Sequence, residues 1–126
     1  MSEHDEQALV IEWAEREAAL YPELNLLFAV PNGAKLPYAK DRRGQRYSPQ
    51  AQKLKKEGLR AGVPDLCLPV ARQGFHGMFI EMKVGKNKPT DAQVAFLDEL
   101  ARQGYYATVC WGAMEAIAAL RAYLEI

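Results

Sequence analysis

Two acidic residues and a lysine stand in segments that otherwise have the pattern of buried strands. Asp65 lies in GVPDLCLPV, residues 62–70, and Glu81 and Lys83 lie in MFIEMKV, residues 78–84. Side chains alternate along a strand, so Glu81 and Lys83 are expected on one face, about 7 Å apart. If the two segments form a hairpin, all three ionisable groups meet at one end of a sheet.

A buried pair of carboxylates is costly without a counter-ion, and one lysine offsets the cost only in part. A divalent cation resolves the conflict. Mg²⁺ prefers oxygen ligands, accepts two protein carboxylates together with waters, and lowers the pKa of a bound water. The alternative is a salt-bridge network of Asp65, Glu81 and Lys83 that holds no ligand. Residue types and spacing alone leave both interpretations open.

The order of these residues resembles the PD-(D/E)XK nucleases. Pro64-Asp65 is followed, after 15 residues, by Glu81-Met82-Lys83. The longer pattern of GVPD, FIEMK and T-x-x-Q, at residues 62–65, 79–83 and 90–93, is similar to the VRR-NUC branch, above all to its stand-alone phage and bacterial members. A lone D…E-x-K arises often by chance, whereas the longer pattern is specific. The resemblance covers most of the chain, from the first helix to VCW.

The resemblance implies metal-assisted hydrolysis of a phosphodiester, with water as the nucleophile. Asp65 and Glu81 would bind Mg²⁺ or Mn²⁺, and the backbone carbonyl of Met82 would be a further ligand. Lys83 would orient or activate the attacking water and help to neutralise the pentacovalent transition state.

Nucleases of this kind usually bring another carboxylate from the first helix. Glu6 lies on the apolar stripe of that helix and is the favoured metal ligand, whereas Glu3, which forms E-x-x-x-Q with Gln7, is the alternative. An acidic residue in a first turn can also simply stabilise the helix dipole. Gln93 is expected either beside the metal site, on a water or the scissile phosphate, or as the capping partner of Thr90.

Charge is unevenly distributed, although the formal net charge is zero. The first 25 residues carry seven acidic side chains and one arginine, whereas residues 35–60 carry nine basic side chains and two acidic ones. The basic segment is therefore the expected phosphate-binding surface. Lys86 and Lys88 flank the expected cleft and are further candidates for holding phosphates, with solvated loop lysines as the alternative. The candidate DNA contacts are Lys35, Lys40, Arg42, Arg43, Lys53, Lys55, Lys56, Lys86 and Lys88.

Periodicity and turn residues predict the elements that position these side chains. Helices are expected over residues 2–21, 48–58, 90–103 and 113–124; buried strands over 24–30, 62–70, 78–84 and 105–111; and an exposed loop over 34–50. Ser2 or Asp5, Ser48 and Thr90 are the expected N-caps. This order predicts one α/β domain over residues 1–126, with a small mixed sheet flanked by helices. The resemblance implies a restriction-endonuclease-like core for it.

The resemblance to stand-alone VRR-NUC proteins implies a metal-dependent, structure-specific endodeoxyribonuclease acting on branched DNA such as four-way (Holliday) junctions. A flap or single-strand nuclease would share the site, and a non-catalytic DNA-binding accessory module would share the fold. A four-way junction has two-fold symmetry, and a two-fold symmetric protein matches it, so we expect a homodimer.

The chain shows no sign of a membrane segment. No apolar run approaches the ~20 residues that span a bilayer, and the start lacks the pattern of a signal peptide. We therefore expect no membrane partner, and a location in the cytoplasm of a bacterial or phage-infected cell. Cys67 and Cys110 lie in apolar runs and are expected as core residues without a disulfide.

Overall fold

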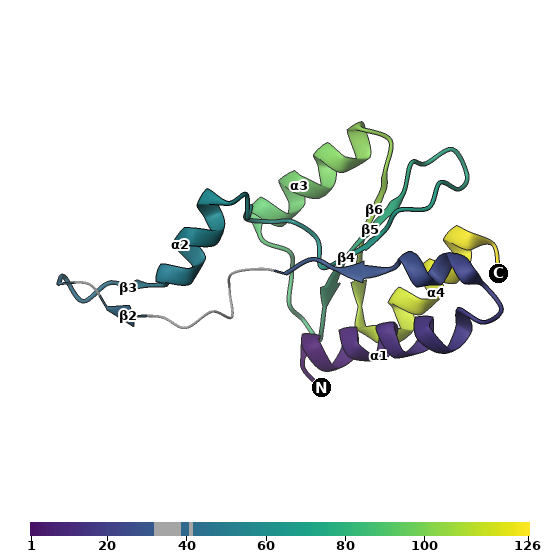
Figure 1. Ribbon diagram of the computed structural model, residues 1–126, viewed down its shortest axis with the longest axis horizontal. Helices are drawn as coiled ribbons and strands as arrows, with labels where there is room; N and C mark the ends of the chain where they lie inside the picture. Colours follow the sequence, from purple (N-terminus) through teal and green to yellow (C-terminus); the bar gives the residue numbers. More distant parts are fainter. Residues whose placement is uncertain (32–38, 41) are drawn as a thin grey trace. The chain divides into compact units, whose positions relative to one another are not determined.

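A four-stranded mixed sheet organises the fold (Figure 1). The computed structural model describes residues 1–31, 39–40 and 42–126. The sheet has the order β1-β4-β5-β6, in which β5 and β6 are parallel and the other neighbours are antiparallel. This arrangement confirms the predicted small mixed sheet. The strands are β1 (Phe28–Ala29), β4 (Leu66–Leu68), β5 (Met78–Lys83) and β6 (Tyr106–Trp111).

Helices cover both faces of this sheet, as predicted for an α/β core (Figure 1). α1 (Glu3–Glu17) and α4 (Gly112–Leu124) pack on the face of β5 that carries Met78, Ile80 and Met82, and together they enclose the main apolar core. α3 (Asp91–Arg102) lies on the opposite face, against β6. Because side chains alternate, the odd-numbered residues of β5 point toward the side of α3.

The helices begin where the sequence predicts them to begin. Ser2 caps α1, Ser48 caps α2 (Pro49–Lys56) and Thr90 caps α3, and each hydroxyl accepts a hydrogen bond from the backbone N–H three residues on. Asp5, the other predicted cap of α1, is the third helical residue and bonds back to the N–H of Ser2. These bonds satisfy donors that a helix start leaves unpaired.

Two of the predicted strands are much shorter than expected. Residues 24–30 form only the two-residue strand β1, because Pro22–Leu26 is a 3-10 helix (η1) that buries Leu24. Of residues 62–70, only β4 is a strand. Gly62 is in the left-handed region, with φ of +86°, and the prolines at 64 and 69 have no N–H to donate to a neighbouring strand.

Backbone contacts divide the chain into two units. Residues 1–30 and 62–126 form the unit that holds the four-stranded sheet, and residues 31–61 form the second unit. In the described part of the second unit, β2 (Ala39–Lys40) pairs antiparallel with β3 (Arg46–Tyr47), and α2 follows. The predicted exposed loop over residues 34–50 therefore contains a short hairpin.

Both cysteines are buried and free, which confirms the prediction for Cys67 and Cys110. Over the described ranges, the structure holds no helix with the length and apolar character that crossing a bilayer requires.

Candidate active site

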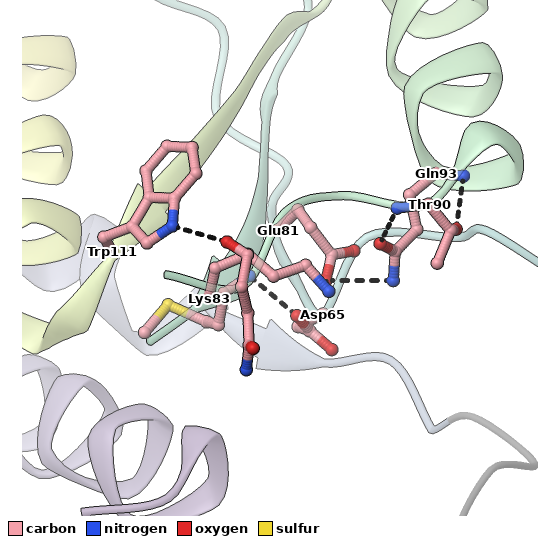
Figure 2. A network of polar contacts seen from close by, with 8 residues as sticks. Asp65, Glu81, Lys83, Thr90, Gln93 and Trp111 are labelled. Carbon is pink, nitrogen blue, oxygen red and sulfur yellow. Dashed lines mark hydrogen bonds and ion pairs between the residues drawn. The ribbon is translucent and has the colours of Figure 1, made fainter. Parts of the chain in front are cut away.

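Asp65, Glu81 and Lys83 converge at one end of the sheet (Figure 2). The register of β4 and β5 pairs Leu66 with Ile80. The antiparallel alignment, extended by one residue, places Asp65 opposite Glu81, and residues opposite each other share a face of the sheet. Lys83, two residues along β5, lies on that face as well. The structure thus brings together the three side chains that the sequence singles out.

Glu81 is the buried centre of this group, with 2% of its surface exposed. Its Oε2 lies 3.6 Å from Lys83 Nζ, whereas Oε1 is buried and receives no hydrogen bond from any described residue. Burial raises the pKa of Glu81, the neighbouring carboxylate of Asp65 raises it further, and Lys83 lowers it in part, so that the pKa is about 8. The arrangement therefore disfavours the ionised carboxylate unless further positive charge is present.

Asp65 is fixed in place by the backbone of β5. Its Oδ2 accepts a hydrogen bond from the N–H of Met82 at 2.7 Å. On the other side of the chain, the Asp65 carbonyl accepts a bond from the N–H of Val30 at 2.7 Å. Asp65 thus bonds to β5 through its side chain and to Val30, the residue after β1, through its backbone, although it precedes the first residue of β4.

The glycine of GVPD has a steric role that sequence reasoning missed. A Cβ built at Gly62 would lie 2.4 Å from the carbonyl oxygen of Ala92 and 3.0 Å from the backbone nitrogen of Gln93. Only a glycine lets the chain pass this close to the first turn of α3, and its φ of +86° also favours glycine. The glycine at position 62 is visible in the sequence, but its close contact with the backbone of α3 appears only in the folded structure.

Gln93 serves both the helix and the site. Its Oε1 accepts a hydrogen bond from the N–H of Thr90 at 2.9 Å, which completes a capping box. Its Nε2 donates to Glu81 Oε2 at 3.3 Å (Figure 2). The capping role of Gln93 is therefore present, and the other end of the same amide lies on the carboxylate of Glu81.

The first-helix glutamates have other neighbours. Glu6 Oε2 accepts a hydrogen bond from the N–H of Ala113 at 2.8 Å. A carboxylate is favourable there, because the start of α4 leaves N–H groups unpaired and Trp111, its N-cap residue, contributes no side-chain cap. Among the residues that the structure describes, no three His, Cys, Asp or Glu side chains are gathered as a metal site. Neither Glu6 nor Glu3 is therefore grouped with the acid pair.

The predicted DNA contacts fall in both units. Lys86 and Lys88 are exposed in the segment after β5. In the second unit, Lys40 lies in β2, and Lys35 lies outside the described residues. The other basic residues predicted for the second unit are exposed, namely Arg42, Arg43, Lys53, Lys55 and Lys56.

The chain is similar to known proteins over most of its length. The family model of the VRR-NUC domain matches residues 1–114. The chain belongs to the VRR-NUC domain family. A solved structure titled "VRR_NUC domain protein" is similar over 99% of this chain and 89% of that chain, with 27% identity and a TM-score of 0.78. No curated protein matches the chain. The predicted VRR-NUC membership within the PD-(D/E)XK superfamily is thus confirmed, and with it a nuclease-type domain.

Proposed function

We propose that this VRR-NUC protein is a Mg²⁺- or Mn²⁺-dependent endodeoxyribonuclease that hydrolyses phosphodiester bonds in branched DNA. The observation that carries the proposal is the pair of acids at Asp65 and Glu81. Glu81 is buried with one oxygen unpaired among the described residues, and its pKa is raised to about 8. A salt-bridge network with Lys83 alone leaves this oxygen unsatisfied, whereas a site that holds a cation would use it.

The donor atoms fit a hard divalent cation. Asp65 and Glu81 would hold it through carboxylate oxygens, with the Met82 carbonyl as a further ligand. We keep Glu6 as an additional ligand through the oxygen that does not bond to Ala113, with Glu3 as the alternative. When bound, such an ion supplies positive charge at the phosphate and lowers the pKa of a bound water.

Lys83 and Gln93 would act directly from the protein. The Lys83 side chain is 9% exposed, and its Nζ lies 3.6 Å from the carboxylate of Glu81. A buried ammonium in this position can orient the attacking water and stabilise negative charge that develops on the phosphate. Gln93 would hold the Glu81 carboxylate in one orientation through its 3.3 Å hydrogen bond. The carboxylate would then already be in position to bind the cation before the reaction begins.

Four-way junctions are the proposed substrate. The exposed basic residues of both units would bind DNA backbone, which reads shape and not sequence. A homodimer would match the two-fold symmetry of a junction. We propose that residues 1–126 act as a single nuclease domain in the cytoplasm of a bacterial or phage-infected cell.

Cleavage assays on a panel of substrates test this proposal. Wild-type protein and Lys83→Ala are incubated with labelled four-way junction, flap, splayed-arm and linear duplex DNA in Mg²⁺, in Mn²⁺ and in EDTA. Arg102→Ala, which changes an exposed cation on α3, is the control. We expect wild type and control to cut the junction only with metal, and Lys83→Ala to bind it without cutting.

Other outcomes of these assays would change the role of Lys83, the substrate or the enzymatic function. Equal cutting by Lys83→Ala would refute the assigned role of Lys83. Cutting of flaps or single strands in place of junctions would replace the substrate but keep the site. DNA binding that is unchanged in EDTA, with no cutting in either metal, would favour an accessory module.

A further inference from the structure

The turn that follows β5 is fastened to the end of β6. The N–H of Asn87 donates to the carbonyl of Val84 at 3.1 Å, and Gly85 within this turn has a φ of +58°. The carbonyl of Asn87 in turn accepts a hydrogen bond from Trp111 Nε1 at 2.8 Å (Figure 2). Both backbone polar groups of Asn87 are therefore held, one within the turn and one by a different strand.

Trp111 is also the neighbour of the lysine of the proposed active site. The parallel register of β5 and β6 pairs Lys83 with Trp111. Adjacent strands lie about 4.8 Å apart, and paired residues share a face of the sheet. The anchored turn thus begins directly beyond Lys83, and the residue that anchors it stands beside Lys83.

This turn carries two lysines. Lys86 and Lys88 flank Asn87 in the sequence and are both exposed. Among the ion pairs of the described residues, none involves either lysine. Holding a flexible side chain against a ligand costs conformational entropy, and a backbone that is already fixed reduces that cost. Two unpaired ammonium groups on an anchored turn are suited to binding phosphates next to the acid pair.

We infer that Trp111 is a positioning residue for DNA: through the carbonyl of Asn87 it fixes Lys86 and Lys88 where they contact phosphates that flank the scissile one. The inference rests on the proposed nuclease function for its ligand. It assigns Trp111 an effect on DNA affinity and leaves the chemical step to Asp65, Glu81 and Lys83.

Trp111→Phe tests this role, because it removes the indole N–H and keeps an aromatic ring. Affinity is measured by fluorescence anisotropy with a labelled four-way junction in EDTA, so that no cleavage intervenes. We expect binding weaker by about three- to tenfold, which corresponds to the loss of one hydrogen bond. The salt dependence of binding should become shallower, because the lysines release fewer counterions. At saturating DNA and metal, the cleavage rate should stay within about twofold of wild type.

A matched control and a mutant cycle separate positioning from general damage. Tyr106→Phe removes a hydroxyl from a residue of the same strand and the same 38% exposure, and it should bind like wild type. In a Lys86→Ala/Lys88→Ala background, Trp111→Phe should cause no further loss, because the groups that it positions are absent. Gly85→Ala should reproduce the loss by straining the left-handed turn without a steric clash.

Two results would overturn the inference: unchanged affinity of Trp111→Phe, whatever the effect of Gly85→Ala, or a full loss in Trp111→Phe that persists without the two lysines. The nuclease proposal is tested separately, by the DNA cleavage of the wild-type protein. Wild-type protein that binds DNA but never cuts it would refute the enzyme, while the affinity measurements would still decide the role of Trp111. Wild-type protein that does not bind DNA would refute both.

Discussion

Gln93 donates a hydrogen bond to Glu81 Oε2 across 3.3 Å while the oxygen of the same amide accepts the N–H of Thr90. One side chain thus connects the start of α3 to the buried acid of the proposed site. Gly62 allows the chain of GVPD to pass against that same turn of α3. The motifs at residues 62–65, 79–83 and 90–93 are therefore in mutual contact, although they are separated in sequence.

Gln93→Glu should separate the two roles of this residue. The glutamate keeps an oxygen for the N–H of Thr90, so the free energy of unfolding should change little. It also places a second negative group beside Glu81, and cleavage should fall by about tenfold or more. Thr90→Ala should do the opposite: it removes the cap and costs about 1 kcal/mol, but it leaves the amide of Gln93 in place. Thermal unfolding and cleavage rates check both variants, and a Gln93→Glu protein with full activity would contradict the role beside Glu81.

Stability of the metal-free protein should fall as the pH rises. The pKa of Glu81 is about 8 in the folded chain against an ordinary value of 4.5. Between these values the folded protein binds a proton that the unfolded chain has released, so the free energy of unfolding decreases from pH 4.5 toward pH 8 and beyond it stays low. In EDTA, the melting temperature of wild type relative to Glu81→Gln should therefore be higher at pH 5 than at pH 8.5. The same difference at both pH values would show that Glu81 ionises freely.

Mn²⁺ should reverse this loss for wild type alone. A cation that binds the folded state raises its stability by mass action, and at pH 8.5 it would compensate the charge of Asp65 and Glu81. Glu81→Gln, which lacks one of the two acids, should gain no stability from the same Mn²⁺ concentration. Melting curves with and without Mn²⁺ check this expectation.

Substitutions of Glu6 distinguish a metal ligand from a helix cap. Glu6→Ala removes the acceptor for the N–H of Ala113 and should cost about 1 kcal/mol. Glu6→Gln keeps a neutral acceptor, so its stability should stay close to wild type, whereas cleavage should need more Mn²⁺. An unchanged Mn²⁺ requirement in Glu6→Gln would leave Glu6 with the cap of α4 alone, and Glu3→Gln would then test the alternative ligand.

Gly62→Ala should damage both stability and cleavage. The new Cβ would lie 2.4 Å from the carbonyl oxygen of Ala92, so the first turn of α3 must move and carry Gln93 with it. We expect a loss of more than about 1 kcal/mol in the free energy of unfolding. Gly74→Ala is a matched control, because Gly74 has a similar φ of +85° and no atom within 4 Å of its Cβ position. Equal effects of the two variants would show that strain, and not the contact with α3, governs this position.

Local signals made much of this structure predictable from sequence. The caps at Ser2, Ser48 and Thr90 depend on a hydroxyl and the following turn, and all three are present. The even-numbered residues of β5 enter the core, and the odd-numbered Glu81 points away from it, as alternation requires. The family followed from motifs in which type, order and spacing agree.

These local signals do not predict contacts between residues that are far apart in the sequence. An apolar run does not distinguish a strand from another buried element, so the pattern predicts a strand that includes Leu24, whereas Leu24 lies in η1. The bond between Glu6 and Ala113 joins residues 107 positions apart, and the bond between Trp111 and Asn87 depends on the register of β6. Such pairs appear only when the sheet brings distant segments together.

Titration with Mn²⁺, followed by calorimetry, tests the central claim most directly. The proteins are wild type, Asp65→Asn, Glu81→Gln and Asp98→Asn, the last changing an exposed acid of α3 as a control. Wild type and Asp98→Asn should bind Mn²⁺ with the same affinity and stoichiometry. Asp65→Asn and Glu81→Gln should remain folded and lose this binding. Undiminished Mn²⁺ binding by both variants would contradict a cation site between these two acids.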